Sequence, residues 1–160
     1  MIYRALLEGD FERLPPILRK FHSAPGNVSA AGAMSIRRQN RFLAWLVGFP
    51  QAGERVPVTL DVAAARGRET WTRTFGDTVR RSTQRAVGGL LVEQTGPVRI
   101  AFRVRACESG MSFESQRTQI WGMPVPLRIE ASVRAGAISW EVEVRFAHIG
   151  SYRGVMTLKS

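Results

Sequence analysis

The chain has 160 residues, of which 44% are hydrophobic and 22% charged, a composition that excludes a disordered or collagen-like chain. This length is sufficient for one domain over residues 1–160 with its own core. The single cysteine excludes an internal disulfide, and the net charge of +10 would attract polyanions such as nucleic acid or anionic lipid.

Residues 1–22 predict short helices. Ile2, Leu6 and Leu7 recur at helical spacing near the start of the chain. The pair Pro15-Pro16 restarts the chain, since proline is tolerated in the first turn of a helix, and an apolar stripe follows at residues 17–21. Pro25-Gly26 then ends the helical region.

Residues 40–49 are too apolar for a loop and lack the alternation of a strand. Asn40 is a suitable N-cap, and Phe49-Pro50 ends the run, so we predict a short helix near 41–48. Its apolar side chains cover most directions around the helix axis, so it must be buried on several sides or inserted into another apolar phase. These apolar residues are Phe42, Leu43, Trp45, Leu46 and Val47.

Two interpretations of this helix remain open. The first is that it is buried as a plug in the core. The second follows from the basic residues that precede it, because a basic and apolar segment can lie in a membrane interface. In that case the contacts with anionic lipid would come from Arg37, Arg38, Arg41, Phe42 and Trp45.

From Val28 onward the dominant hydrophobic period is two, which is typical of antiparallel strands with one buried face. The clearest example is residues 138–146, where every second side chain is apolar. We expect nine or ten strands in meander order, separated by turns that contain glycine. The predicted strands lie near residues 28–36, 56–62, 69–75, 78–86, 90–95, 98–105, 111–121, 127–134, 138–146 and 152–158.

The lack of alternating strands and helices argues against a parallel sheet. A long antiparallel sheet with one apolar face must roll up or stack on itself to bury that face. Because few helices are available to cover it, we predict a mainly β fold. It consists of one antiparallel meander sheet, strongly curved or forming a partial barrel, with short N-terminal helices and the short apolar helix near 41–48.

No residue pattern supports catalysis, and we favour a protein that is not an enzyme. The sequence has no G-x-S-x-G elbow, no glycine-rich phosphate loop before a helix and no H-E-x-x-H pair. One cysteine and two histidines are too few for the usual structural zinc sites. We therefore expect no metal and no cofactor.

Polar residues on apolar strand faces are the best candidates for a binding site. Trp71, Arg73 and Phe75 share one face of a strand, and an inward Arg73 needs an anion, for which Glu93 is the nearest candidate by strand order. Three alternatives stay open: an Arg73–Glu93 pair that braces the sheet, an Arg73 that holds the carboxylate or phosphate of a ligand, or an exposed face. Further candidates near the pocket are Gln119, Trp121 and His148.

Motifs spread over nearly the whole chain resemble a bacterial family known as domain of unknown function 4166. The resemblance implies a small bacterial module that in some relatives is joined to a nicotinamide-cofactor-binding domain of the saccharopine-dehydrogenase type. It implies no catalytic residues. The motifs are Tyr3-Arg4-Ala5-Leu6-Leu7, Phe11-x-Arg13-Leu14-Pro15-Pro16, Arg19-x-Phe21-His22, Phe49-Pro50-x-Ala52-Gly53-Glu54-x-Val56-Pro57-Val58, Glu69-x-Trp71-x-Arg73-x-Phe75-Gly76, Glu93-x-x-Gly96-Pro97, Trp121-Gly122-Met123-Pro124-Val125-Pro126 and Gly150-x-Tyr152-x-Gly154.

The favoured hypothesis is a non-enzymatic pocket protein that binds an apolar or lipid-like small molecule. An accessory domain for a nicotinamide-dependent oxidoreductase partner is the first alternative. A basic nucleic-acid-binding module is the second, and it is disfavoured because the arginines are spaced singly and are not interleaved with stacking aromatics. The chain shows no basic-then-apolar leader and no long apolar run, so we expect a cytoplasmic location.

Overall fold

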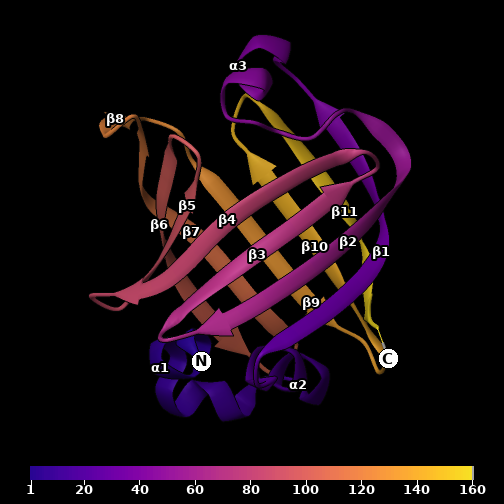
Figure 1. Cartoon of the computed structure of the whole chain (residues 1–160), viewed down its shortest axis with the longest axis vertical. Helices are drawn as coiled ribbons and strands as arrows, with labels where there is room; N and C mark the ends of the chain where they lie inside the picture. The colour runs from indigo at the N-terminus through magenta and orange to yellow at the C-terminus, as the bar shows by residue number, and fades with distance from the viewer. Residues whose placement is uncertain (160) are drawn as a thin grey trace.

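The computed structural model describes residues 1–159 and shows one antiparallel sheet rolled into a barrel (Figure 1). Consecutive strands are neighbours in the sheet almost throughout, as a meander requires. The strands are β1 (Asn27–Arg38), β2 (Gly53–Ala65), β3 (Arg68–Phe75), β4 (Thr78–Val87), β5 (Leu90–Thr95), β6 (Val98–Cys107), β7 (Gly110–Ile120), β8 (Met123–Val125), β9 (Ile129–Ala135), β10 (Ser139–Phe146) and β11 (Gly150–Leu158).

The barrel is closed. Strand β1 pairs with β11, β6 pairs with β7, and β7 pairs with β9, so ten strands form a continuous ring. The short β8 pairs with β7 alone and lies outside the ring. The predicted antiparallel meander is therefore confirmed, but a partial barrel is wrong. Closure gives each of the ten ring strands a neighbour on both sides, which stabilises a sheet of this length.

Two glycines permit a close approach at the β1–β11 seam, where the two ends of the meander meet. A methyl group at Gly32 of β1 would collide with the carbonyl oxygen of Val155. A methyl group at Gly154 of β11 would collide with that of Ala33. Glycine inside a strand commonly marks such a bend or a close backbone approach. Gly154 also belongs to one of the family motifs, which gives that motif a physical reason.

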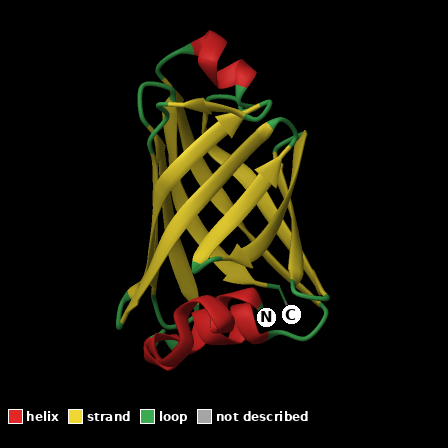
Figure 2. Cartoon of the chain, turned by 90° about the vertical axis from the view of Figure 1, so that its left-hand side faces the viewer, coloured by secondary structure: helices red, strands yellow, loops and turns green. Residues whose placement is uncertain are grey.

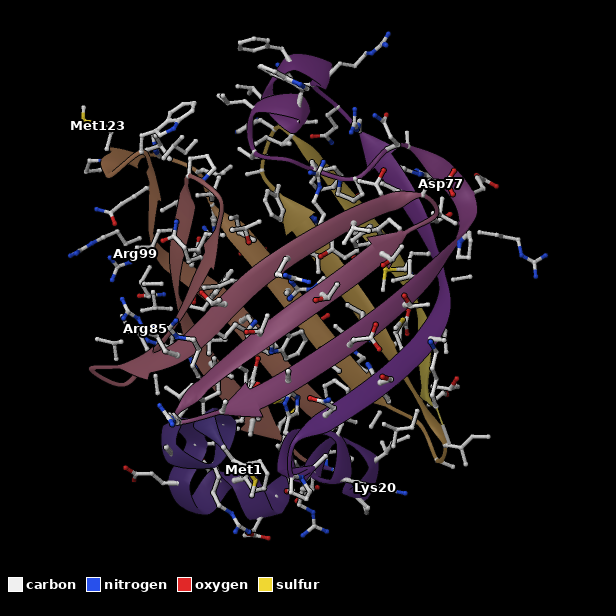
Figure 3. The ribbon with its side chains drawn as sticks, in the orientation of Figure 1. Met1, Lys20, Asp77, Arg85, Arg99 and Met123 are labelled. Atoms are coloured by element: carbon white, nitrogen blue, oxygen red, sulfur yellow. The ribbon has the colours of Figure 1, made fainter. Side chains whose placement is uncertain are left out.

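The alternation seen in the sequence divides the barrel into an apolar inside and a charged outside. On β10, Trp140 and Val144 are buried, whereas the glutamates between them, Glu141 and Glu143, face the outer surface. There Glu141 pairs with Arg153, and Glu143 lies 3.6 Å from an Arg145 nitrogen. Arg85 of β4 and Arg99 of β6 are likewise exposed on the outer surface (Figure 3).

Three short helices cover one end of the barrel: α1 (Ile2–Leu7), η1 (Glu8–Arg13) and α2 (Pro16–Ser23) (Figure 2). The predicted N-terminal helices are thus confirmed, and Pro16 occupies the first turn of α2 as expected. Their inward side chains close the barrel with an apolar layer. Its most deeply buried members are Tyr3, Phe11, Leu14 and Leu18.

Helix α3 (Arg41–Leu46) lies at the opposite end, between β1 and β2 (Figure 1). The Asn40 side chain accepts a hydrogen bond from the Leu43 backbone N–H at 3.0 Å, as an N-cap does. A helix plugged into the core is not what the structure shows, because Phe42 is 67% exposed and Trp45 71% exposed, and only Ala44 is fully buried. Apolar composition could not tell which side of so short a helix faces the barrel.

Among the helices within residues 1–159, none is long and apolar enough to cross a membrane.

Candidate functional site

A cavity of about 210 Å³ lies inside the barrel and reaches from the N-terminal helices to the segment that follows α3. It is larger than the roughly 150 Å³ that holds benzene in an engineered protein core. It is smaller than the ~300–1,000 Å³ of pockets for drug-sized ligands. Apolar side chains from most strands form its wall. They include Met34, Leu60, Phe102, Phe113, Val144 and Phe146.

Four of the candidates that we identified in the sequence line this cavity together. Trp71, Arg73 and Phe75 project inward from β3, because alternate residues of a strand share a face. Glu93 projects inward from β5, two strands away. The guanidinium carbon of Arg73 lies 4.9 Å from the centre of the Trp71 ring, a cation–π distance.

A hydrogen-bonded chain of polar side chains crosses this part of the wall. Arg73 Nη1 donates to Glu93 Oε1 at 3.0 Å and to Ser82 Oγ at 2.9 Å. Gln84 Nε2 donates to Glu93 Oε2 at 3.0 Å. The Tyr3 hydroxyl from α1 then donates to Gln84 Oε1 at 3.0 Å and ties the helical plug to the wall. Of these five residues, Tyr3, Ser82 and Gln84 were not among the sequence candidates.

The Arg73–Glu93 pair is ionised on both sides. Burial opposes the charge of Glu93, but attraction to Arg73 and hydrogen bonds from Ser82, Gln84 and Arg73 outweigh burial and lower the pKa of the carboxyl. Burial likewise opposes the charge of Arg73, but attraction to Glu93 and to the hydroxyls of Tyr152 and Tyr3, together with the hydrogen bond to Glu93, outweighs it and raises the pKa of the guanidinium. The pair therefore adds polarity to the wall without adding net charge.

Arg80 is a second inward arginine that sequence reasoning missed. It stands directly opposite Arg73 in the β3–β4 ladder and lines the same cavity. Its Nε is buried and has no hydrogen-bond partner. Among residues 1–159, no carboxylate lies within salt-bridge distance of its side chain. The inward positions of β4 are polar, so alternation of apolar and polar residues could not identify the inner face of this strand.

The segment after α3 closes the same end of the cavity and is held by a further arginine, Arg38 of β1. Val47, Gly48, Phe49 and Pro50 all line the cavity there. Arg38 holds this segment by donating to the carbonyl oxygens of Phe49 at 2.6 Å and Pro50 at 2.8 Å. Burial, together with the nearby charges of Arg41 and Arg80, lowers the pKa of Arg38. The guanidinium of Arg38 thus lies close enough to those of Arg41 and Arg80 to be repelled by both.

The remaining sequence candidates do not line the cavity. Trp121 is 71% exposed in the turn between β7 and β8, and Gln119 donates to the Gly122 carbonyl at 3.3 Å on an exposed part of β7. His148 is exposed in the turn between β10 and β11, with a φ of 63°. Its inward placement required the strand to continue, but β10 ends at Phe146. All three lie near the α3 end of the barrel, outside the wall.

Fold and site together define a closed antiparallel barrel with an apolar internal cavity and a partly buried ion pair. The family model Domain of unknown function (DUF4166) matches residues 14–156, and the chain belongs to this family. No curated protein matches the chain. Among solved structures, an abundant heat soluble (SAHS) protein from Ramazzottius varieornatus is similar, with 13% sequence identity and a TM-score of 0.48. The alignment covers 86% of this chain and 96% of that one, and implies nothing about what this chain binds.

Proposed function

We propose that the protein binds a slim apolar small molecule, such as an acyl chain or a small ring system, inside the barrel. The observation that carries this proposal is the cavity of about 210 Å³, whose wall is mainly apolar. Burying each methylene of a ligand there contributes about 0.8 kcal/mol. A ligand of this type needs few polar partners, which agrees with a wall whose polar chain from Tyr3 to Ser82 is hydrogen-bonded within itself.

Native mass spectrometry of the protein purified from its own host tests the proposal directly. We expect the folded protein to retain a small apolar molecule that is released on denaturation. If the protein instead carries no molecule and copurifies with a nicotinamide-dependent oxidoreductase, the accessory-domain alternative replaces this proposal.

Filling the cavity should abolish binding without removing the barrel. Ala131 on β9 lines the cavity and stands opposite Val144 and Phe113, two other wall residues. Ala131→Trp places an indole in the space that the ligand needs, and we expect the affinity for 1-decanol, measured by isothermal titration calorimetry, to fall at least tenfold. The neutral alcohol is used so that apolar burial alone is measured.

Ser132→Trp is the matched control, because the adjacent residue of a strand faces the outside of the barrel. It should bind 1-decanol like the wild type. Overpacking costs about 1–3 kcal/mol, so thermal unfolding of each variant checks that the barrel still forms. Ala131→Leu, a smaller addition, should give an intermediate loss of affinity. Equal affinities in all four proteins would contradict binding inside the barrel.

A further inference from the structure

The inner wall of the cavity has more positive charge than negative charge. Among the residues that line it, Glu93 is the only carboxylate, and it is already paired with Arg73 at 3.0 Å. Arg80 and Arg81 also line the cavity at the α3 end, and Arg81 is largely exposed. Arg80 is half-buried, so its charge is the one that most needs a partner.

The position of Arg80 is unfavourable for an unliganded arginine. Like charges that stand directly opposite in a sheet are destabilising, and Arg80 stands opposite Arg73. Its Nε is buried without a hydrogen-bond acceptor, and its guanidinium lies next to Gly48 at the cavity's end, 3.5 Å from where a methyl group on that glycine would stand. Arg38 cannot neutralise Arg80 because it is also positively charged, and its N–H groups donate to the carbonyl oxygens of Phe49 and Pro50.

We propose that the ligand of this cavity is an amphiphile whose carboxylate or phosphate binds Arg80, while its apolar part lies deeper in the barrel. This inference rests on the proposed function and adds the chemical class and the orientation of the ligand. A guanidinium presents several N–H donors in a plane that match the oxygens of a carboxylate or phosphate. The apolar part then extends past Arg73 toward Trp71, in the direction of the N-terminal helices.

Arg73, which the sequence had suggested as the headgroup contact, is less suited to this role. Its Nη1 is shared between Glu93 and Ser82, and an incoming anion would be repelled by the adjacent carboxylate. Arg80 has no salt bridge to a carboxylate, and its guanidinium lies next to Gly48 at the end of the cavity formed by residues 47–50. The polar end of the ligand can therefore reach Arg80 without crossing the apolar wall.

A calorimetric comparison of decanoate with 1-decanol tests the assignment, because the two molecules share an apolar tail and differ in charge. At neutral pH we expect the wild type to bind decanoate about tenfold to hundredfold more tightly than 1-decanol. Arg80→Gln should remove most of this preference while leaving the affinity for 1-decanol unchanged. Arg85→Gln is the matched control, since Arg85 is an exposed residue of the same strand (Figure 3) and its loss changes the net charge equally. Decyl phosphate, tested in the same way, distinguishes the two headgroups.

The outcomes separate this inference from the proposed function. If wild type and Arg80→Gln bind decanoate and 1-decanol equally, the cavity takes apolar ligands and the role of Arg80 is refuted. If the preference for decanoate is lost in Arg73→Gln but kept in Arg80→Gln, the anion binds at Arg73 instead. If no protein binds 1-decanol or decanoate, the proposed function itself fails.

A different observation concerns the outer surface at the α3 end. Four large apolar side chains are more than two-thirds exposed there: Phe42 and Trp45 on α3, and Trp121 and Met123 at the β7–β8 turn. The two elements stand at the same end of the barrel, with α3 and β8 both away from the N-terminal helices (Figures 1 and 3). Together these four residues form what we name the apolar rim.

Basic residues flank α3. Arg37 and Arg41 are exposed beside it, and residues 37–53 contain no acidic residue. Two exposed carboxylates lie at the same end of the barrel, Glu54 at the start of β2 and Asp77 in the β3–β4 turn (Figure 3). Tryptophan and phenylalanine next to arginine are the side chains that favour the boundary between lipid headgroups and acyl chains. We infer that the apolar rim docks on an anionic lipid surface, with Arg37 and Arg41 near the phosphates. This inference stands on the exposed side chains and does not require a ligand in the cavity.

Flotation with vesicles tests the docking surface. At low salt the protein should float with vesicles of phosphatidylglycerol and phosphatidylcholine, stay in solution with phosphatidylcholine alone, and be released at high salt. Trp45→Ala should reduce the bound fraction severalfold. Ile138→Ala is the matched control, because Ile138 is 79% exposed in the β9–β10 turn at the opposite end. No binding to anionic vesicles, or the same binding for Trp45→Ala as for the wild type, would overturn the inference.

Discussion

Glu93→Leu is expected to lower the free energy of unfolding by roughly 3–5 kcal/mol, because it leaves the charge of Arg73 inside the barrel without a counterion. The side chains of Arg73 and Glu93 are only 22% and 15% exposed, so water cannot replace the lost carboxylate well. The loss is made worse by Arg80, which stands opposite Arg73. Urea unfolding monitored by tryptophan fluorescence measures the change.

The exposed pair Glu141–Arg153 provides the control for this prediction. Glu141→Leu removes a carboxylate from the outer face of β10, where the Arg153 side chain is 66% exposed. Surface ion pairs contribute about 0–1 kcal/mol, so this change should be small. A loss after Glu93→Leu no larger than after Glu141→Leu would show that the internal pair does not brace the barrel.

The double variant Arg73→Met with Glu93→Leu distinguishes an unpaired charge from lost packing. Replacing both members of a buried pair with apolar residues of similar size is often neutral or stabilising. We therefore expect the double variant to regain most of the stability that Glu93→Leu loses. If the losses of stability in Arg73→Met and Glu93→Leu simply add in the double variant, lost packing causes the destabilisation and the unpaired charge does not.

The barrel wall around Arg73 could be predicted from the sequence because two simple rules apply there. Alternation placed Trp71, Arg73 and Phe75 on one face, and the meander order put Glu93 within reach of that face. Closure was harder to predict. The β1–β11 pairing depends on the tilt of the strands and on the close approach that Gly32 and Gly154 permit between β1 and β11. Neither feature is encoded in a local sequence pattern.

Other parts of the site depend on contacts between distant residues. The Tyr3–Gln84 hydrogen bond joins residues 81 positions apart, and neither residue carries a local signal of a shared site. Arg80 was overlooked because β4 has polar residues on its inner face as well as its outer face. His148 was predicted to face the inside of the barrel because the alternation of inward and outward residues was extended two residues beyond Phe146, where β10 ends.

His22 should make the barrel sensitive to acid. It is 7% exposed in the plug of N-terminal helices, and its ring centre lies 3.9 Å from that of Tyr3 and 5.0 Å from that of Phe21. Burial lowers the pKa of His22 to about 3, from an ordinary value near 6.5. Glu69 lines the same small recess as His22, and burial raises its own pKa.

The direction of the effect follows from which state binds the proton. Below about pH 6.5 the unfolded chain protonates His22, whereas the folded barrel keeps it neutral until about pH 3. Above pH 6.5 His22 is neutral in both states and does not reduce the free energy of unfolding. Below that pH the free energy of unfolding falls as the pH decreases, by roughly 3 kcal/mol at pH 4. Glu69 acts in the opposite sense, because its raised pKa lets the folded state take up a proton first. Glu93, whose pKa is lowered in the folded barrel, stabilises the fold until the pH falls below about 4.3, the ordinary pKa of a glutamate.

His22→Leu should therefore flatten the dependence of the unfolding free energy on pH between 6.5 and 4.5, a window that lies above the titration of Glu93. Urea unfolding at a series of pH values compares the slopes of the variant and the wild type. His148→Leu is the control, since His148 is the only other histidine and lies exposed in the β10–β11 turn. It should keep the wild-type slope. If His22→Leu also keeps that slope, the imidazole is protonated in the folded barrel. Water or an anion must then reach it through the helical plug, in disagreement with its packing against Tyr3 and Phe21.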